Sequence, residues 1–332
     1  MRKHLVAALL ATTLGTHDML AMAEPALDVL GRDFSFPHRI EGMPSKLSDF
    51  GGLRINTFVT NDGVNLAYWE AGRGKPLIFV PGWSANGAQY INVMYLLVKD
   101  YHVYVLDPRN QGLSQHVDYG TRIARYSMDL KQLGEHLGVT SADYVGHSMG
   151  AAILWSYIDL FGTTGMRKVA FVDEPISIYS HSDWSEKERA EAGGTTTSPE
   201  RMVAAFTTGG PVNKLVTDMK VLERSQLLDS PYFANSEAFA SAVIKSDRKA
   251  MGQVLFNHTV SDWRDVVRRK IDIPAAIFSG DESNNLPCQR WAQSVMPNAT
   301  LYAYTSADQG DHFLMFKNPV KFVGDLRAFL ER

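Results

Sequence analysis

The sequence predicts an α/β protein, with a mostly parallel β-sheet covered by helices on both faces and interrupted by an inserted helical block. Short apolar runs with strand character alternate with segments of helical periodicity over residues 54–174 and 268–332, and this alternation is typical of parallel sheets. The alternation stops between residues 175 and 267, where only helix signals remain. The composition, 45% hydrophobic and 21% charged over 332 residues, is that of an ordinary globular protein.

The first half of the sheet is predicted from compact apolar runs bounded by turn residues. The two earliest runs flank Asn61-Asp62-Gly63, a signal typical of a β-hairpin. The expected strands are Arg54–Val59, Val64–Trp69, Lys75–Val80, Tyr101–Leu106, a short one at Tyr144-Val145, and Lys168–Val172. The expected helices between them are Tyr90–Val98, Tyr126–Leu137 and Met149–Leu160, of which the second shows a clear apolar side.

The inserted block and the second half of the core follow. Within residues 175–267, Ser198 followed by Pro199 is typical of a helix start. Further helices are expected over Asn235–Ile244 and Asp247–Phe256. The core then resumes with strands Ala275–Ser279 and Thr300–Tyr304 and helices Gln289–Val295 and Pro319–Leu330. Residues 24–53 lack clear periodicity and are interpreted as an N-terminal arm packing over the domain.

The first 23 residues have the pattern of a secretory signal peptide. Arg2 and Lys3 precede an apolar run over Leu5–Leu14, and small residues follow at Ala21 and Ala23. The run is too short to span a bilayer, which needs about 20 apolar residues. We therefore expect cleavage after Ala23 and an exported protein, periplasmic or secreted, without membrane insertion after cleavage.

Charge and cysteine content narrow the function classes. The net charge is -3, so no basic excess indicates a nucleic-acid partner. Cys288 is the single cysteine of the chain, which excludes an intrachain disulfide and a multi-cysteine metal site. The sequence gives no reason to expect a metal or another cofactor, and it does not reveal the oligomeric state.

The segment Gly146-His147-Ser148-Met149-Gly150 matches the nucleophile motif G-x-S-x-G. It lies after a predicted strand and opens a predicted helix, the context that gives this motif its meaning. A serine on such a sharp turn projects its hydroxyl out of the sheet, and the helix start brings backbone N–H groups beside a reacting carbonyl. Ser148 is therefore the candidate nucleophile.

Four landmarks in order make residues 54–332 resemble the α/β-hydrolase fold family. They are Pro81-Gly82-Trp83, Asp107–Ser114, Gly146–Gly150 and Gly310–Phe313. Within that family the chain looks most similar to cofactor-free esterases once classified as non-haem chloroperoxidases, which carry a helical cap after the sixth strand. The resemblance implies a triad in the order serine, acid, histidine, and His312, in a polar turn after the last predicted strand, matches the base.

The position of the acid departs from the family pattern. The usual position is occupied by Ser283, which cannot supply the charge that stabilises an imidazolium. One alternative is Asp281 or Glu282 in a shifted loop. The other, which we favour, is an acid after the sixth strand, where Asp173 lies 25 residues beyond the nucleophile and Glu174 follows it.

The expected activity is cleavage of a small-molecule ester or lactone through an acyl-enzyme. The resemblance implies an oxyanion hole formed by the backbone N–H groups of Trp83 and Met149. Trp184, Tyr232 and Trp263 in the helical block are candidate pocket walls. The alternatives are a C–C bond, thioester or amide hydrolase using the same triad, and a non-catalytic protein that binds a small ligand on the same fold.

Overall fold

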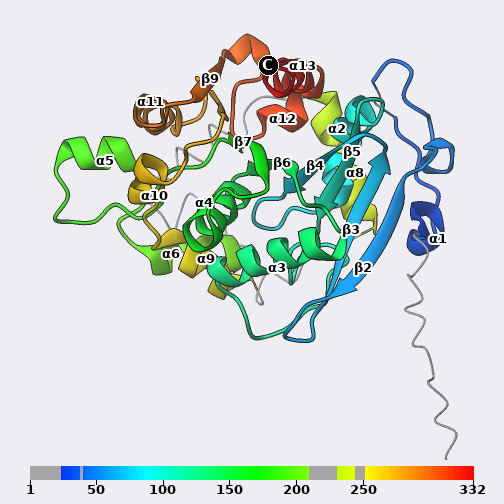
Figure 1. The fold of residues 1–332 in the computed structure, drawn as a ribbon, viewed down its shortest axis with the longest axis horizontal. Coiled ribbons are helices and arrows are strands. Elements are labelled where there is room, and N and C mark those ends of the chain that lie inside the picture. Colours follow the sequence, from blue (N-terminus) through cyan, green and yellow to red (C-terminus); the bar gives the residue numbers. More distant parts are fainter. Residues whose placement is uncertain (1–23, 38–39, 209–229, 244–250) are drawn as a thin grey trace, which may run out of the picture.

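A single nine-stranded sheet organises the protein in the computed structural model (Figure 1). The structure describes residues 24–37, 40–208, 230–243 and 251–332. Its strands lie in the order β1-β2-β3-β5-β4-β6-β7-β8-β9. Their bounds are β1 Glu24–Pro25, β2 Arg54–Val59, β3 Asn65–Gly72, β4 Lys75–Val80, β5 Tyr101–Leu106, β6 Ala142–His147, β7 Met166–Val172, β8 Ala275–Gly280 and β9 Ala299–Tyr304.

The sheet is antiparallel at one end and parallel elsewhere. Strands β1, β2 and β3 pair antiparallel, and β3 pairs antiparallel with β5. From β5 through β4, β6, β7 and β8 to β9 every pairing is parallel. The carboxyl ends of these parallel strands therefore meet along one edge, where open α/β sheets bind their ligands.

Helices cover both faces of the sheet, which explains the nearly continuous apolar runs of its central strands. In β4 the side chains alternate between two buried clusters: Leu77 and Phe79 belong to one, and Ile78 and Val80 to the other. The first cluster is closed by α2 (Ile91–Leu97), α12 (Leu314–Lys317) and α13 (Pro319–Leu330). The second is closed chiefly by α3 (Ile123–His136), α4 (Met149–Phe161) and α11 (Leu286–Val295).

The N-terminal arm packs against the first of these clusters. It begins with β1 and α1 (Ala26–Leu30) and includes a short 3₁₀ turn at Leu47–Asp49. Its apolar side chains are buried with those of the sheet, namely Phe36, Ile40, Met43, Leu47, Phe50 and Leu53. The arm thus completes this side of the core, and Figure 1 shows its helix α1 beside β2.

The insertion after β7 is helical where it is described. Its helices are α5 Glu186–Ala192, α6 Pro199–Thr207, α8 Pro231–Val243, α9 Gly252–Thr259 and α10 Arg264–Arg269. The Ser198 side chain accepts a hydrogen bond from the Arg201 N–H, and Pro199 takes the first position of α6, as the sequence indicates. The predicted signal peptide and part of the predicted helix 247–256 lie outside the described residues. Within the described ranges, no helix combines the length and apolar character that crossing a bilayer requires.

Candidate active site

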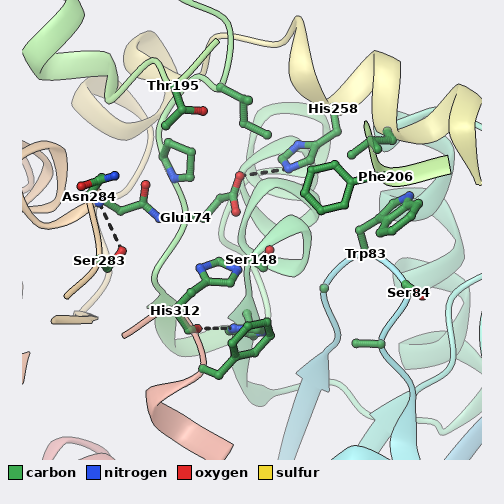
Figure 2. A pocket seen from close by; sticks show the side chains of 18 of the residues that line it. Trp83, Ser84, Ser148, Glu174, Thr195, Phe206, His258, Ser283, Asn284 and His312 are labelled. Carbon is green, nitrogen blue, oxygen red and sulfur yellow. Dashed lines mark hydrogen bonds and ion pairs between the residues drawn. The ribbon is translucent and has the colours of Figure 1, made fainter. Parts of the chain in front are cut away.

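Ser148 lies on a strained turn between β6 and α4. Its backbone has φ 53° and ψ -130°, a conformation that side-chain-bearing residues seldom adopt. Such strain costs on the order of 1–3 kcal/mol and persists where the surroundings enforce it. Here the Ser148 N–H donates to Val172 O at 2.9 Å, which continues the parallel ladder into the turn. The side chain points into the cavity above the sheet edge (Figure 2).

The glycines on either side of the serine are sterically required. A Cβ on Gly146 would lie 2.5 Å from Gly150 O, and a Cβ on Gly150 would lie 1.9 Å from Val80 O. Both contacts are to backbone, which has little room to yield. The turn can therefore exist only with glycine at these two positions of the motif.

Asp173 occupies the matching position at the end of the neighbouring strand β7. It is fully buried and also has a positive φ, 50°. Its N–H donates to Phe278 O at 2.8 Å. His147 and Val172, the last residues of β6 and β7, pair with each other in the parallel register. The two strained residues that follow them, Ser148 and Asp173, therefore lie side by side.

His312 meets the carboxylate of Asp173. Nδ1 of His312 lies 2.8 Å from Oδ2 of Asp173, and the imidazole is 15% exposed. Burial opposes the charged ring, but the hydrogen bond and the charge of Asp173 outweigh it and raise the pKa of His312. Ser148 and His312 line the same cavity and lie near one another in Figure 2. Serine, histidine and a buried carboxylate are thus brought together in the order that a hydrolytic triad needs.

The other three candidate acids lie elsewhere. Asp281 is exposed. Glu282 accepts a hydrogen bond from Ser306 Oγ at 2.5 Å. Glu174 is buried beside the cavity, where it pairs with His258 at 2.9 Å. The carboxylate on Nδ1 of His312 therefore comes from the end of β7 and not from the loop after β8.

Sequence reasoning did not foresee the side chains that hold Asp173. Ser279 and Ser283 donate their hydroxyls to its two carboxylate oxygens at 2.5 and 2.7 Å, and Asn285 donates from Nδ2 at 3.1 Å. The register of β7 and β8 explains the contact with Ser279. Val172 pairs with Phe278, so the next residues, Asp173 and Ser279, also lie side by side. The serine that occupies the usual acid position is thus a hydrogen-bond donor to the acid that replaces it.

Three further contacts fix the loop that carries His312. His147 donates from Nε2 to the carbonyl of His312 at 2.8 Å, and burial lowers its own pKa to about 3, so the ring is neutral and can keep Nδ1 unprotonated. Asp311 and Lys317, both fully buried, form an ion pair beside it. Asp311 also accepts the Phe313 N–H at 2.8 Å. The backbone of His312 is therefore held at its own carbonyl and through the preceding residue, Asp311.

The loop after β4 passes directly over the nucleophile. A Cβ on Gly82 would come within 2.9 Å of Ser148 Cβ. Gln111 clamps this loop by donating to the carbonyls of Gly82 and Ala85 at 2.9 and 2.7 Å. Trp83 lies between these two residues, and its indole donates to Met251 O at 3.2 Å, which ties the loop to the insertion.

Met149 is the first residue of α4. The first N–H groups of a helix have no partner inside it and carry partial positive charge. Met149 thus follows Ser148 directly, and Trp83 follows Gly82, whose backbone packs on Ser148.

The cavity has a volume of about 560 Å³, a size typical of small-molecule sites. The insertion supplies much of its apolar wall. The apolar side chains lining it are Trp83, Ile178, Met202, Phe206, Phe233, Leu255, Phe313 and Phe316. Among the described residues, no group of three or more His, Cys, Asp or Glu is arranged to hold a metal ion.

The expected pocket walls need correction. Trp184, Tyr232 and Trp263 are not among the described residues that line the cavity. The guanidinium of Arg264 stacks on Trp184, with its Cζ atom 4.1 Å from the centroid of the Trp184 ring. Tyr232 and Trp263 pack against the two core clusters instead. Phe206 and Phe233, which do line the cavity, carry the same aromatic signal in the sequence.

Comparison with known proteins agrees with the fold. A family model described as "alpha/beta hydrolase fold" matches residues 75–222. The chain has the α/β-hydrolase fold, and residues 75–222 carry the match to that family. Its similar relatives include a "Non-heme chloroperoxidase CPO-A1" of Kitasatospora aureofaciens, 26% identical over 82% of this chain and 98% of that protein. A "Non-heme haloperoxidase" of Rhodococcus erythropolis is 24% identical over 82% and 99%.

Solved structures share the fold of this α/β-hydrolase. The esterase RhEst1 from Rhodococcus sp. ECU1013 superposes with a TM-score of 0.66 at 22% identity, covering 83% of this chain and 98% of that one. The esterase EaEST from Exiguobacterium antarcticum gives 0.68 at 16% identity, covering 83% and 99%. At these identities the likeness shows the fold, and the chemistry must be argued from the site.

Proposed function

We propose that this α/β-hydrolase is a cofactor-independent serine hydrolase that cleaves carboxylic esters or lactones through an acyl-enzyme. The observation that carries the proposal is the 2.8 Å contact between Asp173 and His312 in the cavity that Ser148 enters. A weak hydroxyl nucleophile needs an adjacent base that a third group orients. The esterase titles of the structural neighbours support the same reading.

In the proposed reaction, Ser148 Oγ attacks the carbonyl carbon while its proton passes to Nε2 of His312. Asp173 holds Nδ1 and stabilises the imidazolium that forms. The N–H groups of Met149 and Trp83 stabilise the oxyanion, each by on the order of 3 kcal/mol. The imidazolium returns its proton to the leaving alkoxide. Water, deprotonated by His312, then attacks the acyl-enzyme and releases the acid and free serine.

The names of the haloperoxidase relatives fit the same intermediate. Hydrogen peroxide attacking the acyl-enzyme in place of water would release a peracid and regenerate Ser148. We propose perhydrolysis only as a side reaction, because it uses no residue beyond the triad. A serine at position 148 does not fit epoxide hydrolysis, since that reaction in this fold uses an aspartate as nucleophile.

Replacing the nucleophile tests the proposal. Ser148→Ala should abolish turnover of 4-nitrophenyl esters and labelling by a serine-reactive phosphonate, because it removes the hydroxyl that the turn between β6 and α4 presents to the cavity. The melting temperature should change little, since only one oxygen is removed. Multiple turnovers per phosphonate-labelled site in the unsubstituted protein would separate an enzyme from a ligand-binding protein. Retention of more than a few per cent of activity in Ser148→Ala would show that another residue attacks.

A further inference from the structure

A second acid–histidine pair lies in the wall of the catalytic cavity, and the proposed mechanism does not use it. Nε2 of His258, on α9, lies 2.9 Å from Oε1 of Glu174, which follows Asp173. Their side chains are 4% and 3% exposed, so both ionisable groups are almost fully withdrawn from water. Figure 2 shows this pair above Ser148 and His312, with the His258 ring next to Phe206.

The outer nitrogen of this histidine is left without a partner. Nδ1 of His258 is buried and has no hydrogen-bond partner among the described residues. Leaving a buried polar atom unpaired costs about 1–3 kcal/mol. His258 nevertheless lines the cavity, and the carboxylate of Glu174 lies in ion-pair distance of the opposite ring nitrogen. An oriented ring with one unused polar atom, in a wall that is otherwise mainly apolar, is the arrangement expected of a ligand-anchoring group.

We propose that Glu174 and His258 form a substrate-recognition subsite, in which Nδ1 of His258 hydrogen-bonds a hydroxyl group that the ester or lactone carries away from its scissile bond. The inference rests on the proposed hydrolase function and names the substrate class for the same cavity. Glu174 acts through His258 and is a positioning residue, whereas His258 contacts the substrate.

A hydroxyl group suits this position better than an anion. A hydroxyl can donate or accept, so it satisfies Nδ1 whether that atom carries a proton or a lone pair. A substrate carboxylate would instead approach Glu174 and Asp173, two consecutive buried acids. Like charges in a low-dielectric wall repel strongly. The apolar side chains around His258, Phe206 and Leu255 among them, would enclose the carbon chain that bears the hydroxyl.

Oε1 of Glu174 and Nδ1 of His147 also lack a hydrogen-bond partner among the described residues. The first, however, makes the ion-pair contact with His258, and the ring of the second is held by the His312 carbonyl. A third atom competes for the role. Nδ2 of Asn284 also lacks a hydrogen-bond partner among the described residues and belongs to the lining of the cavity. It stands in the loop after β8, whereas His258 stands on α9. A variant at each position can therefore tell which of them recognises the hydroxyl.

Matched ester pairs provide the test. Ethyl butanoate is compared with ethyl 2-hydroxybutanoate and ethyl 3-hydroxybutanoate, and propyl butanoate with 2-hydroxyethyl butanoate. The monoethyl ester of succinic acid serves as the anionic probe. Hydrolysis is measured by titrating the acid that is released. The readout is kcat/KM for the hydroxylated ester divided by kcat/KM for the plain ester. Comparing one ratio between variants cancels the intrinsic reactivity of each ester.

The variants separate recognition from structure. Gln at position 258 keeps an amide donor for Glu174 but has no group at the place of Nδ1. We expect His258→Gln to lower the ratio for the preferred pair about 10- to 100-fold, the loss of one buried hydrogen bond. His258→Asn, which keeps a polar group near Nδ1, should retain part of the preference. Thr259→Val is the control on the same helix, since that hydroxyl donates to Leu255 O at 2.8 Å, within the helix itself.

The outcomes decide between the readings. A hydroxyl preference in at least one pair, lost in His258→Gln and kept in Thr259→Val, supports the subsite. The inference is overturned if the unsubstituted enzyme shows no preference in any pair or prefers the succinate ester. It is equally overturned if Asn284→Ala moves the ratio and His258→Gln does not. A fall in melting temperature with an unchanged ratio would mean that the pair is only structural.

Failure of this inference is distinguishable from failure of the proposed function. If the esters are hydrolysed and the phosphonate labels Ser148 while the ratio stays fixed, only the subsite is refuted. Calorimetric binding of the same esters to Ser148→Ala needs no turnover. Equal Kd values for hydroxylated and plain esters there would refute the subsite even if no ester were cleaved.

Discussion

Asp173 is held by more side-chain contacts than its role as a single carboxylate requires. It is fully buried, its backbone is strained, and three donors besides His312 converge on its carboxylate. Hydrogen bonds from protein donors replace those that a buried carboxylate loses from water. Ser283 joins these donors from the position where related hydrolases carry their acid. The loop after β8 thus supplies a donor to the acid that follows β7.

Replacing the carboxylate of Asp173 by a carboxamide, in Asp173→Asn, should disable the base. The carboxamide fits the same space but removes the charge that stabilises the imidazolium, and in a serine protease the same change lowers turnover about 10⁴-fold. We expect a loss of two to four orders of magnitude in kcat, with the melting temperature nearly kept. The charge of Asp173 also raises the pKa of His312, so the acid limb of kcat/KM against pH should move to lower pH in the residual activity.

Asp281→Asn is the matched control, because that carboxylate is exposed at the neighbouring loop. It should leave both the rate and the acid limb where they are in the unsubstituted enzyme. A large loss of kcat in Asp281→Asn would contradict the assignment of the acid. An acid limb that stays at the same pH in Asp173→Asn would contradict it as well.

The strand–turn–helix element around Ser148 shows how tightly the site depends on local geometry. Glycine inside a helix is ordinarily destabilising, by about 0.5–1 kcal/mol relative to alanine. Gly150 lies in the first turn of α4 and Gly324 within α13, so propensity alone would favour alanine at both. Their surroundings differ, because a Cβ on Gly150 meets Val80 O whereas one on Gly324 meets nothing within 4 Å.

The two glycines therefore give opposite predictions at the scale of the element. Gly150→Ala should lower the free energy of unfolding by about 1–3 kcal/mol through overpacking, and it should lower kcat by displacing the turn. Gly324→Ala should raise it by up to about 1 kcal/mol and leave kcat unchanged. Urea unfolding followed by circular dichroism measures both. Equal effects of the two substitutions would remove the steric explanation of the motif.

Elements with strong local signals were predictable from the sequence, and those shaped by packing were not. The bounds of β4 and β5 match the apolar runs at Lys75–Val80 and Tyr101–Leu106. Strand β6 extends well beyond its apolar pair, to Ala142–His147, because neighbouring strands on both sides hold its polar residues in the ladder. Register with β7 is what brings Asp173 beside Ser148, and register is a property of the folded sheet.

The insertion limits what the sequence can predict about specificity. The sequence does not distinguish the aromatic residues of the helical block that face the cavity from those that do not. Phe206 lines the cavity, whereas Trp184 packs against Arg264 near the surface. Which of them faces the cavity depends on how the helices dock over the sheet edge. The Glu174–His258 pair arises in the same way, since it joins the end of β7 to α9 across 84 residues of chain.

At the scale of the whole molecule, the N-terminal arm completes the core. Its buried side chains, among them Phe36 and Phe50, share a cluster with Leu77 and Phe79 of the central strand. Burying one large apolar side chain stabilises by about 1.5–3 kcal/mol. Removing an arm with six such side chains would therefore forfeit on the order of 10 kcal/mol before chain entropy is counted, which is comparable to the stability of a typical domain.

The last prediction follows from this arm and from the proposed export. We propose that the mature chain begins at Glu24, which is also the first residue of β1. A chain starting at Glu24 should have the melting temperature of the protein recovered from its native host, because every described contact of the arm is kept. A chain starting at Arg54 should lose cooperative unfolding or melt at least about 10 °C lower, since its sheet face is exposed. N-terminal sequencing of the native protein checks the start, and calorimetry compares the two truncations. Equal melting temperatures would show that the arm does not complete the core, and a native chain that retains Met1 would refute the export.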